Sequence, residues 1–336
     1  MWMIITKAWW HLPLSRPHKE AVKAIVFRSM PFLFRNSRAY RNWHEAQQWS
    51  LQQDHIKSMD TDDRTNVNLW KGSDSIYQPE PVPVEPITTL AVIIHAFHFE
   101  IFQEIIEYFK NNSGATFKFY VTCPSELSDK ITGFFNQAHY KFSLLVVENH
   151  GRDILPFLKI LPQAFKDGAQ VILKIHTKKS DHRLSGKLWR KDLYTKLLKE
   201  KAIKQALNIL NKDHSVGLIG PRGHIVPMNL YYGANAKRIK NLSNAMGIES
   251  SQLPGLNFSA GSMFYARRQA LMPLLNLGLL TENFEQEQGQ KDGTVAHAVE
   301  RVFAISTLAA NLKLVDTLYN PEKRELNITK DHPFTQ

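Results

Sequence analysis

From residue 89 onward, short apolar runs alternate with longer amphipathic segments, and this alternation constrains the fold more than any other feature. The apolar runs have the length and β-branched content of buried strands, whereas the segments between them repeat apolar residues every three or four positions, as helices do. We expect strands at 90–97, 117–123, 142–150, 171–176, 215–221 and 259–267, and helices at 100–111, 125–138, one ending near 165, 189–198, 200–210, 268–278 and 293–311. Such alternation favours a mainly parallel sheet with helices on both faces, so we predict an α/β fold.

Composition and charge narrow the possible partners. The 336 residues suffice for one large α/β domain or two smaller ones. The net charge of +11 points to anionic partners such as nucleotides, nucleic acid or acidic lipids. The single cysteine, Cys123, excludes an internal disulfide and fits a reducing compartment, so we expect a cytoplasmic protein. No apolar run is long enough to span a bilayer, and the first residues do not have the pattern of a signal peptide.

The chain before the alternating region is different in character. We expect a basic, aromatic helical extension at 1–77, a proline-rich linker at 78–88, the α/β domain at 89–320 and a tail at 321–336. The first 45 residues hold eight Lys or Arg and two acids, interleaved with Trp and Phe. This mixture fits a segment lying on an anionic membrane surface. The expected surface is the inner face of the cytoplasmic membrane. The alternative is a helical extension whose aromatic side chains pack on the main domain.

The most informative strand is the one at 171–176, because it ends in a polar run of His176, Thr177, Lys178 and Lys179. Ligands of open α/β sheets sit beyond the carboxyl ends of strands, so this run is a candidate anion site. Basic side chains outnumber acidic ones seven to one between Lys174 and Lys191, which suits a phosphate or diphosphate. The alternative is a solvated basic helix.

Two further strand ends carry polar residues. Asn149 and Asp153 flank Gly151 where the strand at 142–150 leads into a helix, and Gly151 relieves the turn. Asp153 is placed to cap that helix or to hold a ribose or a metal. His95 and His98 flank the end of the first strand, near the expected position of a nucleotide, and either could equally be a packed core residue.

Residues 284–303 form another polar concentration. Asp292 precedes the start of the last long helix, where capping is a sufficient structural explanation. Three carboxylates are candidates for a general base, which must reach an acceptor hydroxyl: Glu285, Glu287 and Asp292. The helix then places Thr294, His297 and Arg301 on one face, with Glu300 on the neighbouring face.

Two more features suggest a substrate pocket. A Gly261-Ser262 step falls inside the predicted strand at 259–267, where glycine often marks the close approach of a ligand. The loop at 222–258 offers Tyr231 and Tyr232, whose rings suit stacking on a sugar, although either could be a packed loop residue.

Three motifs are missing from the expected strand ends. There is no D-x-D at a strand end, no G-x-G-x-x-G after a strand and no G-x-x-x-x-G-K-[ST]. Dinucleotide-dependent redox chemistry and P-loop hydrolysis therefore lose most of their support. Nucleic acid is not expected as a partner, because the basic residues cluster at one strand end and at the N-terminus and no recognition module is present.

Six separate blocks together resemble the rhamnan synthesis protein F family of bacterial polysaccharide glycosyltransferases. They are HAFHF (95–99), NHGRDILPFL (149–158), KIHTKKS with WR (174–180 and 189–190), GLIGP (217–221), AGSMFYAR (260–267) and GQKDGTVAHAVERVF (289–303). The resemblance covers about residues 89–310. It implies a single Rossmann-like domain similar to the GT-A glycosyltransferases. It also implies transfer of rhamnose or a similar sugar from a nucleotide-sugar donor to a polysaccharide, a lipid-linked oligosaccharide or a lipopolysaccharide O-antigen.

The resemblance also assigns roles to residues. GT-A enzymes usually hold a metal with D-x-D, whereas here the comparable strand ends in His176-Thr177-Lys178, so we expect fixed positive charge and no metal cofactor, with a divalent cation as the alternative. The expected base is Asp292, with Glu287 second. Donor-binding residues are His95, His98, Asn149, Arg152, Asp153, His176, Lys178, Lys179 and Arg190, and the acceptor or substrate pocket comprises Gly261, Ser262, His297, Glu300, Arg301 and Tyr231.

One reading from a different class stays open at this point. The chain could be a non-catalytic scaffold or a sugar-binding component of a polysaccharide assembly complex. The sheet and the basic strand end would then persist, whereas Asp292 and its neighbours would have only structural roles.

Overall fold

The computed structural model describes residues 16–30, 34, 40, 79–177, 186–253, 255–290, 292–324 and 328. Contacts divide the chain into two units, Met1–Thr61 and Asp62–Gln336. In the first unit the helix α2 spans Arg16–Ser29, within the expected helical extension. Within the described ranges, no helix combines the length and apolar character needed to cross a membrane.

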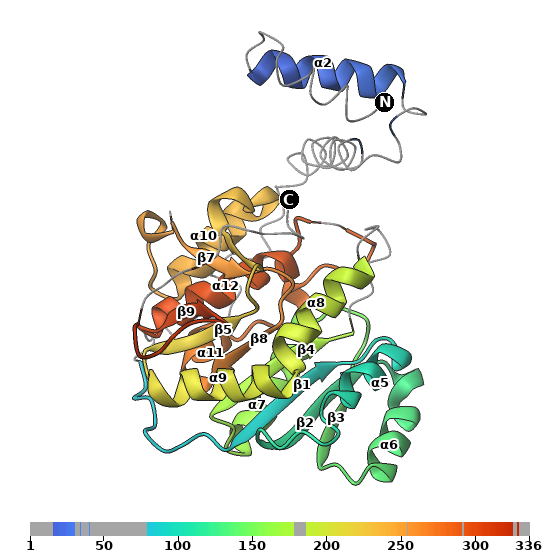
Figure 1. Ribbon diagram of the computed structural model, residues 1–336, viewed down its shortest axis with the longest axis vertical. Coiled ribbons are helices and arrows are strands. Elements are labelled where there is room, and N and C mark those ends of the chain that lie inside the picture. Colours follow the sequence, from blue (N-terminus) through green and yellow to red (C-terminus); the bar gives the residue numbers. More distant parts are fainter. Residues whose placement is uncertain are drawn as a thin grey trace. The chain divides into compact units, whose positions relative to one another are not determined.

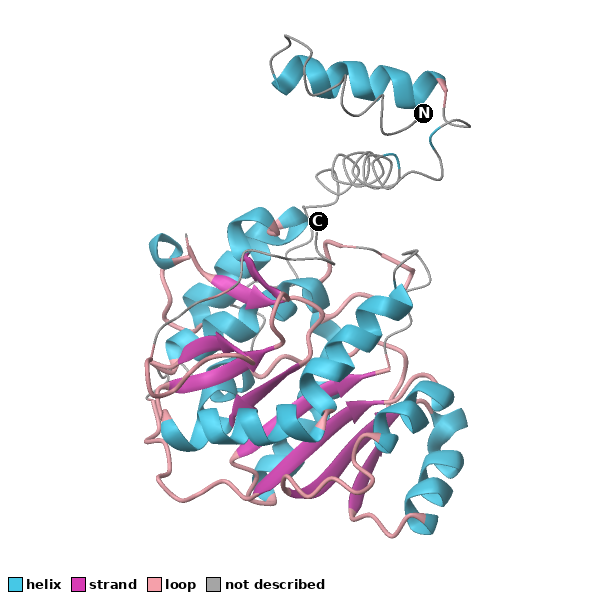
Figure 2. Ribbon diagram, in the orientation of Figure 1, coloured by secondary structure: helices cyan, strands magenta, loops and turns pink. Residues whose placement is uncertain are grey.

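The second unit is built on a seven-stranded sheet (Figures 1 and 2). Its strand order is β3-β2-β1-β4-β8-β5-β9, and only β8 runs antiparallel to its neighbours. The strands are β1 (Thr89–His95), β2 (Thr116–Cys123), β3 (Phe142–Val146), β4 (Val171–His176), β5 (Val216–Gly220), β8 (Phe264–Arg267) and β9 (Lys313–Asp316). A separate antiparallel pair consists of β6 (Ile225–Pro227) and β7 (Asn257–Ser259). The predicted α/β class with a mainly parallel sheet in one Rossmann-like domain is confirmed.

Helices cover both faces of this sheet, as the alternating pattern predicts. They are α5 (Phe99–Glu107), α6 (Ser128–Gln137), α7 (Ile154–Lys166), α8 (Gly186–Leu198), α9 (Glu200–Lys212), α10 (Ala236–Ala245), α11 (Arg268–Leu275) and α12 (Val295–Ala309). Short 3-10 turns lie at Ser125–Leu127, Met228–Leu230, Gly233–Asn235, Ser250–Gln252 and Thr281–Asn283.

Two hydrophobic cores lie on the two faces of the sheet. One core is formed with α7, α10, α11 and α12, and the other with α5, α6, α8 and α9. The strand β4 is buried along its whole length and contributes to both, because its side chains alternate: Ile172 enters the first core, and Leu173 and Ile175 enter the second. Each such buried side chain contributes about 1.5–3 kcal/mol relative to exposure, so β4 is firmly fixed at the centre of the sheet.

The segment 259–267 does not form the single strand that its sequence predicts. The strand β7 ends at Ser259, and a turn separates it from β8. In that turn Gly261 has φ +89° and Ser262 has φ +55°, and two consecutive residues in the left-handed region cannot continue a strand. The Gly261-Ser262 step therefore lies in a turn, which sends β8 back antiparallel to β4.

Candidate functional site

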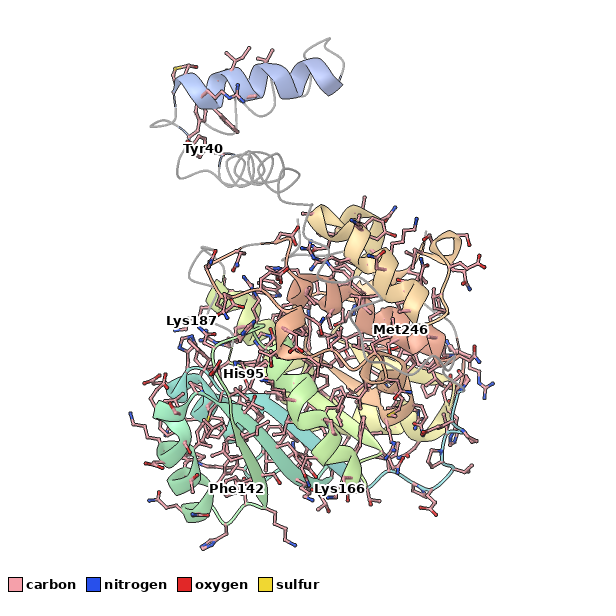
Figure 3. All side chains as sticks on the ribbon, turned by 180° about the vertical axis from the view of Figure 1, so that it is seen from behind. Tyr40, His95, Phe142, Lys166, Lys187 and Met246 are labelled. Carbon is pink, nitrogen blue, oxygen red and sulfur yellow. The ribbon has the colours of Figure 1, made fainter. Side chains whose placement is uncertain are left out.

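The carboxyl ends of β1, β2 and β4 lie level with one another at one edge of the sheet. His95 ends β1 and is paired in register with Thr122 on β2 and with His176 on β4. The strand order reverses between β1 and β4, and ligands of open α/β sheets bind in the crevice at such a point. Figure 3 shows His95 at the end of the sheet away from Phe142 and Lys166.

A lysine is buried directly below this edge. Lys174 is 1% exposed, and it lies on the same face of β4 as Ile172, toward α7 and α12. Its Nζ donates to Asp153 Oδ2 at 2.5 Å, to the Ser262 carbonyl oxygen at 2.8 Å and to Ser262 Oγ at 2.9 Å. It also lies 5.2 Å from the centre of the Phe157 ring. Burial lowers the pKa of Lys174, but three acceptors match the three N–H donors of an ammonium, so we assign the charged form.

The carboxylate of Asp153 is the centre of the local electrostatics. Burial alone would raise its pKa, but His176 and Lys174 outweigh burial and hold the pKa far below the ordinary value of 3.8. The Asp153 carboxyl is therefore ionised throughout the neutral range. Its Oδ2 lies 3.8 Å from His176 Nε2. The side chain does not cap α7, in contrast to one of the two roles that the sequence suggested.

The neighbouring histidines differ in their surroundings. Burial lowers the pKa of His95 to about 4; Asp153 opposes this effect and Lys174 adds to it, so His95 is neutral at pH 7. Its Nδ1 lies 2.9 Å from Thr122 Oγ1. His176 Nε2 lies 3.0 Å from the Gly261 carbonyl oxygen, which favours the tautomer with a proton on Nε2.

The turn at 261–262 joins this cluster to the last long helix. The Gly261 N–H donates to Glu300 Oε1 at 2.7 Å, and Glu300 Oε2 accepts from Arg301 at 3.3 Å. Arg301 is 7% exposed and donates to the carbonyl oxygens of His297 and Tyr231, at 2.7 and 3.2 Å. The expected stripe of polar side chains on this helix is thus a continuous network that begins at the strand ends.

Asp292 is the far end of the same network. Its side chain is almost fully buried, and its oxygens accept from Asn235 Nδ2 at 2.6 Å and from the Ala234 N–H at 3.3 Å. Arg301 lies 3.8 Å away. Asp292 does not cap α12, because Thr294 is the N-cap and forms a capping box with His297.

The other two candidate carboxylates are held in different ways. Glu285 accepts from the Val295 N–H at 2.8 Å, at the start of α12, and from Arg238 at 3.3 Å. Glu287 is more open, with 22% of its side chain exposed, and lies 3.9 Å from Arg152 Nε. Among the three carboxylates, Glu287 has the fewest internal partners in the described part of the chain.

The turn before α7 is strained and packed against residues 284–290. Gly151 has φ +64° and Arg152 has φ +57°. Arg152 donates to the Gln290 carbonyl oxygen, and His150 Nε2 lies 2.9 Å from the Phe284 carbonyl oxygen. These contacts fasten the segment that carries Glu287 to the N-terminal end of α7.

Not every predicted residue joins this network. Arg190 lies 3.5 Å from Glu104, His98 precedes α5, and Asn149 is exposed. The predicted residues Lys178 and Lys179 lie outside the described residues. The structure brings together ten of the others around the strand ends and α12: His95, Arg152, Asp153, His176, Gly261, Ser262, Glu287, Asp292, Glu300 and Arg301, with His297 and Tyr231 bound to Arg301.

Three residues in this network were not among the predicted site residues. Lys174 had a signal in the sequence, since a lysine inside a six-residue apolar strand is rare unless it is paired. Thr177 fastens two loops together, because its Oγ1 accepts from the N–H groups of Phe97 and His98 at 2.7 and 3.1 Å. Asn235 had no signal, because it reaches Asp292 only through the folding of the segment 222–258, which contains β6 and α10 and is not the expected loop.

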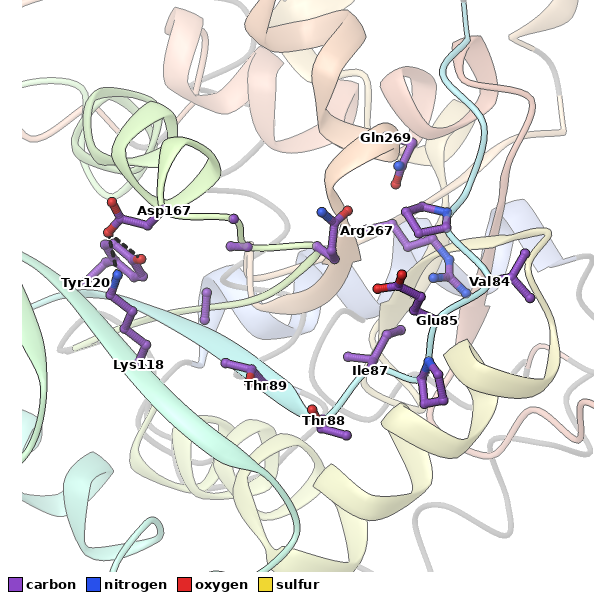
Figure 4. A pocket seen from close by; sticks show the side chains of 16 residues that line it. Val84, Glu85, Ile87, Thr88, Thr89, Lys118, Tyr120, Asp167, Arg267 and Gln269 are labelled. Atoms are coloured by element: carbon purple, nitrogen blue, oxygen red, sulfur yellow. Dashed lines mark hydrogen bonds and ion pairs between the residues drawn. The ribbon is translucent and has the colours of Figure 1, made fainter.

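A separate hollow of about 600 Å³ lies at the other end of these strands, where β1 and β4 begin (Figure 4). The linker at 83–88 forms one wall, and Lys118, Asp167 and Arg267 are among its other residues. Lys118 and Asp167 already form an ion pair at 2.6 Å. None of the predicted site residues lines this hollow, so we place the candidate site at the carboxyl ends of β1 and β4. In the ranges that the structure describes, no cluster of His, Cys, Asp and Glu could hold a metal ion.

Comparison with known proteins gives the chain a family. The family model described as rhamnan synthesis protein F matches residues 46–312. The chain belongs to the rhamnan synthesis protein F family. Two curated relatives, both named uncharacterized protein WxcX and from two strains of Xanthomonas campestris pv. campestris, are 34% identical to this family member over 215 residues. The match covers 64% of this chain and 31% of each relative, so the chain spans about a third of their length.

One solved structure is also similar to this member of the rhamnan synthesis protein F family. It is the mannosyltransferase PcManGT from Pyrobaculum calidifontis in complex with GDP-Man and Mn²⁺. The TM-score is 0.36 at 10% sequence identity, and the match covers 80% of this chain and 66% of that one.

The turn before α7 generates a prediction about stability. A Cβ added at Gly151 would lie 2.5 Å from Leu155 Cβ and 2.9 Å from Phe284 Cδ1, in addition to the strain of a positive φ. We expect Gly151→Ala to lower the free energy of unfolding by about 2–5 kcal/mol. Gly168→Ala is the matched control, because Gly168 has φ +88° with open space around it, and should cost about 1–2 kcal/mol. Equal losses in chemical denaturation would contradict the packing argument.

Proposed function

We propose that this chain is a glycosyltransferase that takes a nucleotide-sugar donor and transfers rhamnose or a similar sugar to a growing cell-surface polysaccharide. The observation that carries the proposal is the polar network at the switch point between β1 and β4, in a chain of the rhamnan synthesis protein F family. A lipid-linked oligosaccharide or a lipopolysaccharide O-antigen is the proposed acceptor. The cytoplasmic side of the membrane, where nucleotide sugars are made, is the proposed location.

The donor is proposed to lie across the ends of β1 and β4. Neutral His95, ionised Asp153 and His176 supply hydrogen-bonding groups for its hydroxyls, and Arg152 supplies a guanidinium for its diphosphate. His98, Asn149, Lys178, Lys179 and Arg190 complete the proposed donor-binding set. Diphosphate charge would then be neutralised by fixed cations, so we propose transfer that does not require a divalent cation.

The acceptor is proposed to lie beside the turn at 261–262 and the N-terminal half of α12. Glu300 and Tyr231 border that region, and Gly261 allows close approach. The proposed general base is Asp292, with Glu287 second. Glu287 is more exposed than Asp292, and a base must reach the acceptor hydroxyl, so the two candidates require a direct comparison.

One observation favours the non-catalytic alternative. Asn235, Ala234 and Arg301 already occupy the oxygens of Asp292, as expected for a carboxylate with a structural role. A scaffold or sugar-binding component would keep the same network without turnover.

The donor proposal predicts selective nucleotide binding. The purified protein is melted with dTDP, UDP, GDP or CMP at about 100 times the dissociation constant. With one base class its free energy of unfolding should rise by about 2.7 kcal/mol and its melting temperature by several degrees. The gain should persist in EDTA. Arg152→Gln should weaken it, whereas Lys118→Gln, which removes a cation at the opposite edge of the sheet, should leave it unchanged. No response to any nucleotide would favour the scaffold, and a response that needs manganese would refute metal independence.

The base assignment predicts a split between binding and turnover. Asp292→Asn should abolish sugar transfer while nucleotide binding stays within about twofold, because a general base acts on the acceptor and does not hold the donor. Glu287→Gln is the matched comparison. If Glu287→Gln abolishes transfer and Asp292→Asn does not, Glu287 is the base. Normal transfer by both variants removes both assignments.

Residues 1–45 are proposed to attach the chain to an anionic membrane surface. Of this segment, α2 is described, and Ile25 on it is 65% exposed. The full chain should co-sediment with phosphatidylglycerol vesicles but not with phosphatidylcholine vesicles. Replacing Lys19, Lys23 and Arg28 by Gln should weaken the free energy of binding to the anionic vesicles by about 1 kcal/mol per residue. The same change at Lys201, Lys204 and Lys212 of α9 is the control, and an equal loss there would argue against a specific role for the segment.

A further inference from the structure

Lys174 has no capacity left for a ligand. Its three ammonium protons are taken by Asp153 Oδ2 and by the carbonyl and hydroxyl oxygens of Ser262, at 2.5, 2.8 and 2.9 Å. The side chain is 1% exposed, and its Nζ lies beside the rings of Phe157 and Phe303, 5.2 and 5.9 Å from their centres. A lysine in this position cannot contact a donor diphosphate without losing an internal bond. Its effect on a ligand must pass through the groups that it holds.

Those groups belong to three different elements. Lys174 is on β4, Asp153 is at the start of α7, and Ser262 is in the turn before β8. The same turn also holds Glu300, which accepts a hydrogen bond from the Gly261 N–H at 2.7 Å. One ammonium group therefore sets the relative positions of both sides of the proposed site.

Asp153 keeps one oxygen available after Lys174 is bound. Its Oδ2 contacts Lys174, whereas no described residue donates to Oδ1, and 17% of the side chain remains exposed. Besides Lys174, the titratable groups that act on Asp153 include His95 on β1 and His176 on β4. A carboxylate oxygen in this position is an acceptor suited to hydroxyl groups of a ribose or a sugar.

We propose that Lys174 is a positioning residue of the donor site, which keeps the Asp153 carboxylate charged and oriented so that Oδ1 accepts hydrogen bonds from donor hydroxyls. The inference rests on the proposed function. It adds that the Asp153 carboxylate recognises the donor hydroxyls and that the buried Lys174 charge supports this carboxylate. Lys174 itself touches no ligand.

The charged and titratable groups around Asp153 determine what happens without Lys174. Besides Lys174, they are His176 on β4, His95 on β1, the adjacent Arg152 and, across the ammonium, Glu300 on α12. An opposite charge at hydrogen-bonding distance lowers a carboxyl pKa by about 1–3 pH units. Removal of Lys174 should therefore raise the pKa of Asp153 by about that amount, since burial then acts with less opposition.

The first experiment needs no ligand. Urea unfolding of wild-type protein, Lys174→Met, Asp153→Asn and the double variant is measured between about pH 2 and 6. In the wild type the folded pKa of Asp153 lies below its unfolded value, so this group contributes stability above about pH 4 and loses it only on stronger acidification. In Lys174→Met the folded pKa of Asp153 moves up toward the unfolded value, so Asp153 contributes less stability above about pH 4 and less is lost on acidification. Relative to wild type, the stability of Lys174→Met should therefore rise as the pH falls below about 4.

The double variant decides whether Asp153 is the coupled group. It replaces the ion pair by a neutral pair of similar size, so it should fold even where Lys174→Met does not. The relative rise in stability at low pH should be absent from it. If the double variant shows the same rise as Lys174→Met, another group is responsible and the inference is overturned. Ser262→Ala removes one bond to Nζ without changing charge, and it should keep the wild-type pH dependence.

The second experiment measures binding of dTDP, UDP and GDP by titration calorimetry to the same four proteins. Each single variant should lower the affinity for the selected nucleoside diphosphate by about 10- to 100-fold. The double variant should bind no more weakly than whichever single variant binds more weakly. Multiplying losses would show that Lys174 acts independently of Asp153 and would overturn the inference. If no nucleotide binds the wild type, the proposed function fails and its donor site with it, while the unfolding series still decides the coupling of Lys174 to Asp153.

Discussion

The buried ion pair between Lys174 and Asp153 is the interaction on which the candidate site depends. An unpaired ammonium at the centre of a sheet would be costly, and removal of one partner of a buried pair typically costs about 3–5 kcal/mol. The pair is tolerated because Ser262 supplies the two remaining acceptors at 2.8 and 2.9 Å. The pair therefore requires that β4, α7 and the turn before β8 come together in one arrangement. The pair fixes the relative positions of these three elements more than it stabilises the fold.

This arrangement separates the charges of the site into two classes. The cations next to the sheet are used internally, because Lys174 is bound to Asp153 and Arg301 to Glu300, with Asp292 3.8 Å from Arg301. Arg152, by contrast, keeps 35% of its side chain exposed, beside Glu287. An anionic ligand would therefore be met by cations at the rim of the strand ends, while the interior supplies a neutral imidazole and a carboxylate. That combination suits a ligand with both phosphates and hydroxyls.

The fold was largely predictable from the sequence because its signals are local. Every predicted strand from 90 to 221 and every predicted helix overlaps an observed one, since apolar periodicity reports which side chains face a core. The failures occurred where distant contacts decide. The turn at Gly261 interrupts a run that reads as a strand, α10 is a polar helix fixed by packing against α12, and β9 is a short run at an edge of the sheet. The antiparallel direction of β8 follows from that turn.

The site was predictable in its composition but not in its connections. The family resemblance assigned His95 and His176 to one donor-binding set, and the two residues are indeed paired in register at the ends of β1 and β4. Asp292 could not be interpreted in the same way. Its sequence context suggests a helix cap, yet Thr294 performs that role and Asp292 instead accepts from Asn235, 57 residues earlier in the chain. The segment 222–258 is not the loop that the sequence suggested, because it contains β6 and α10. The environment of the Asp292 carboxylate therefore depends on how this segment packs, which local sequence does not report.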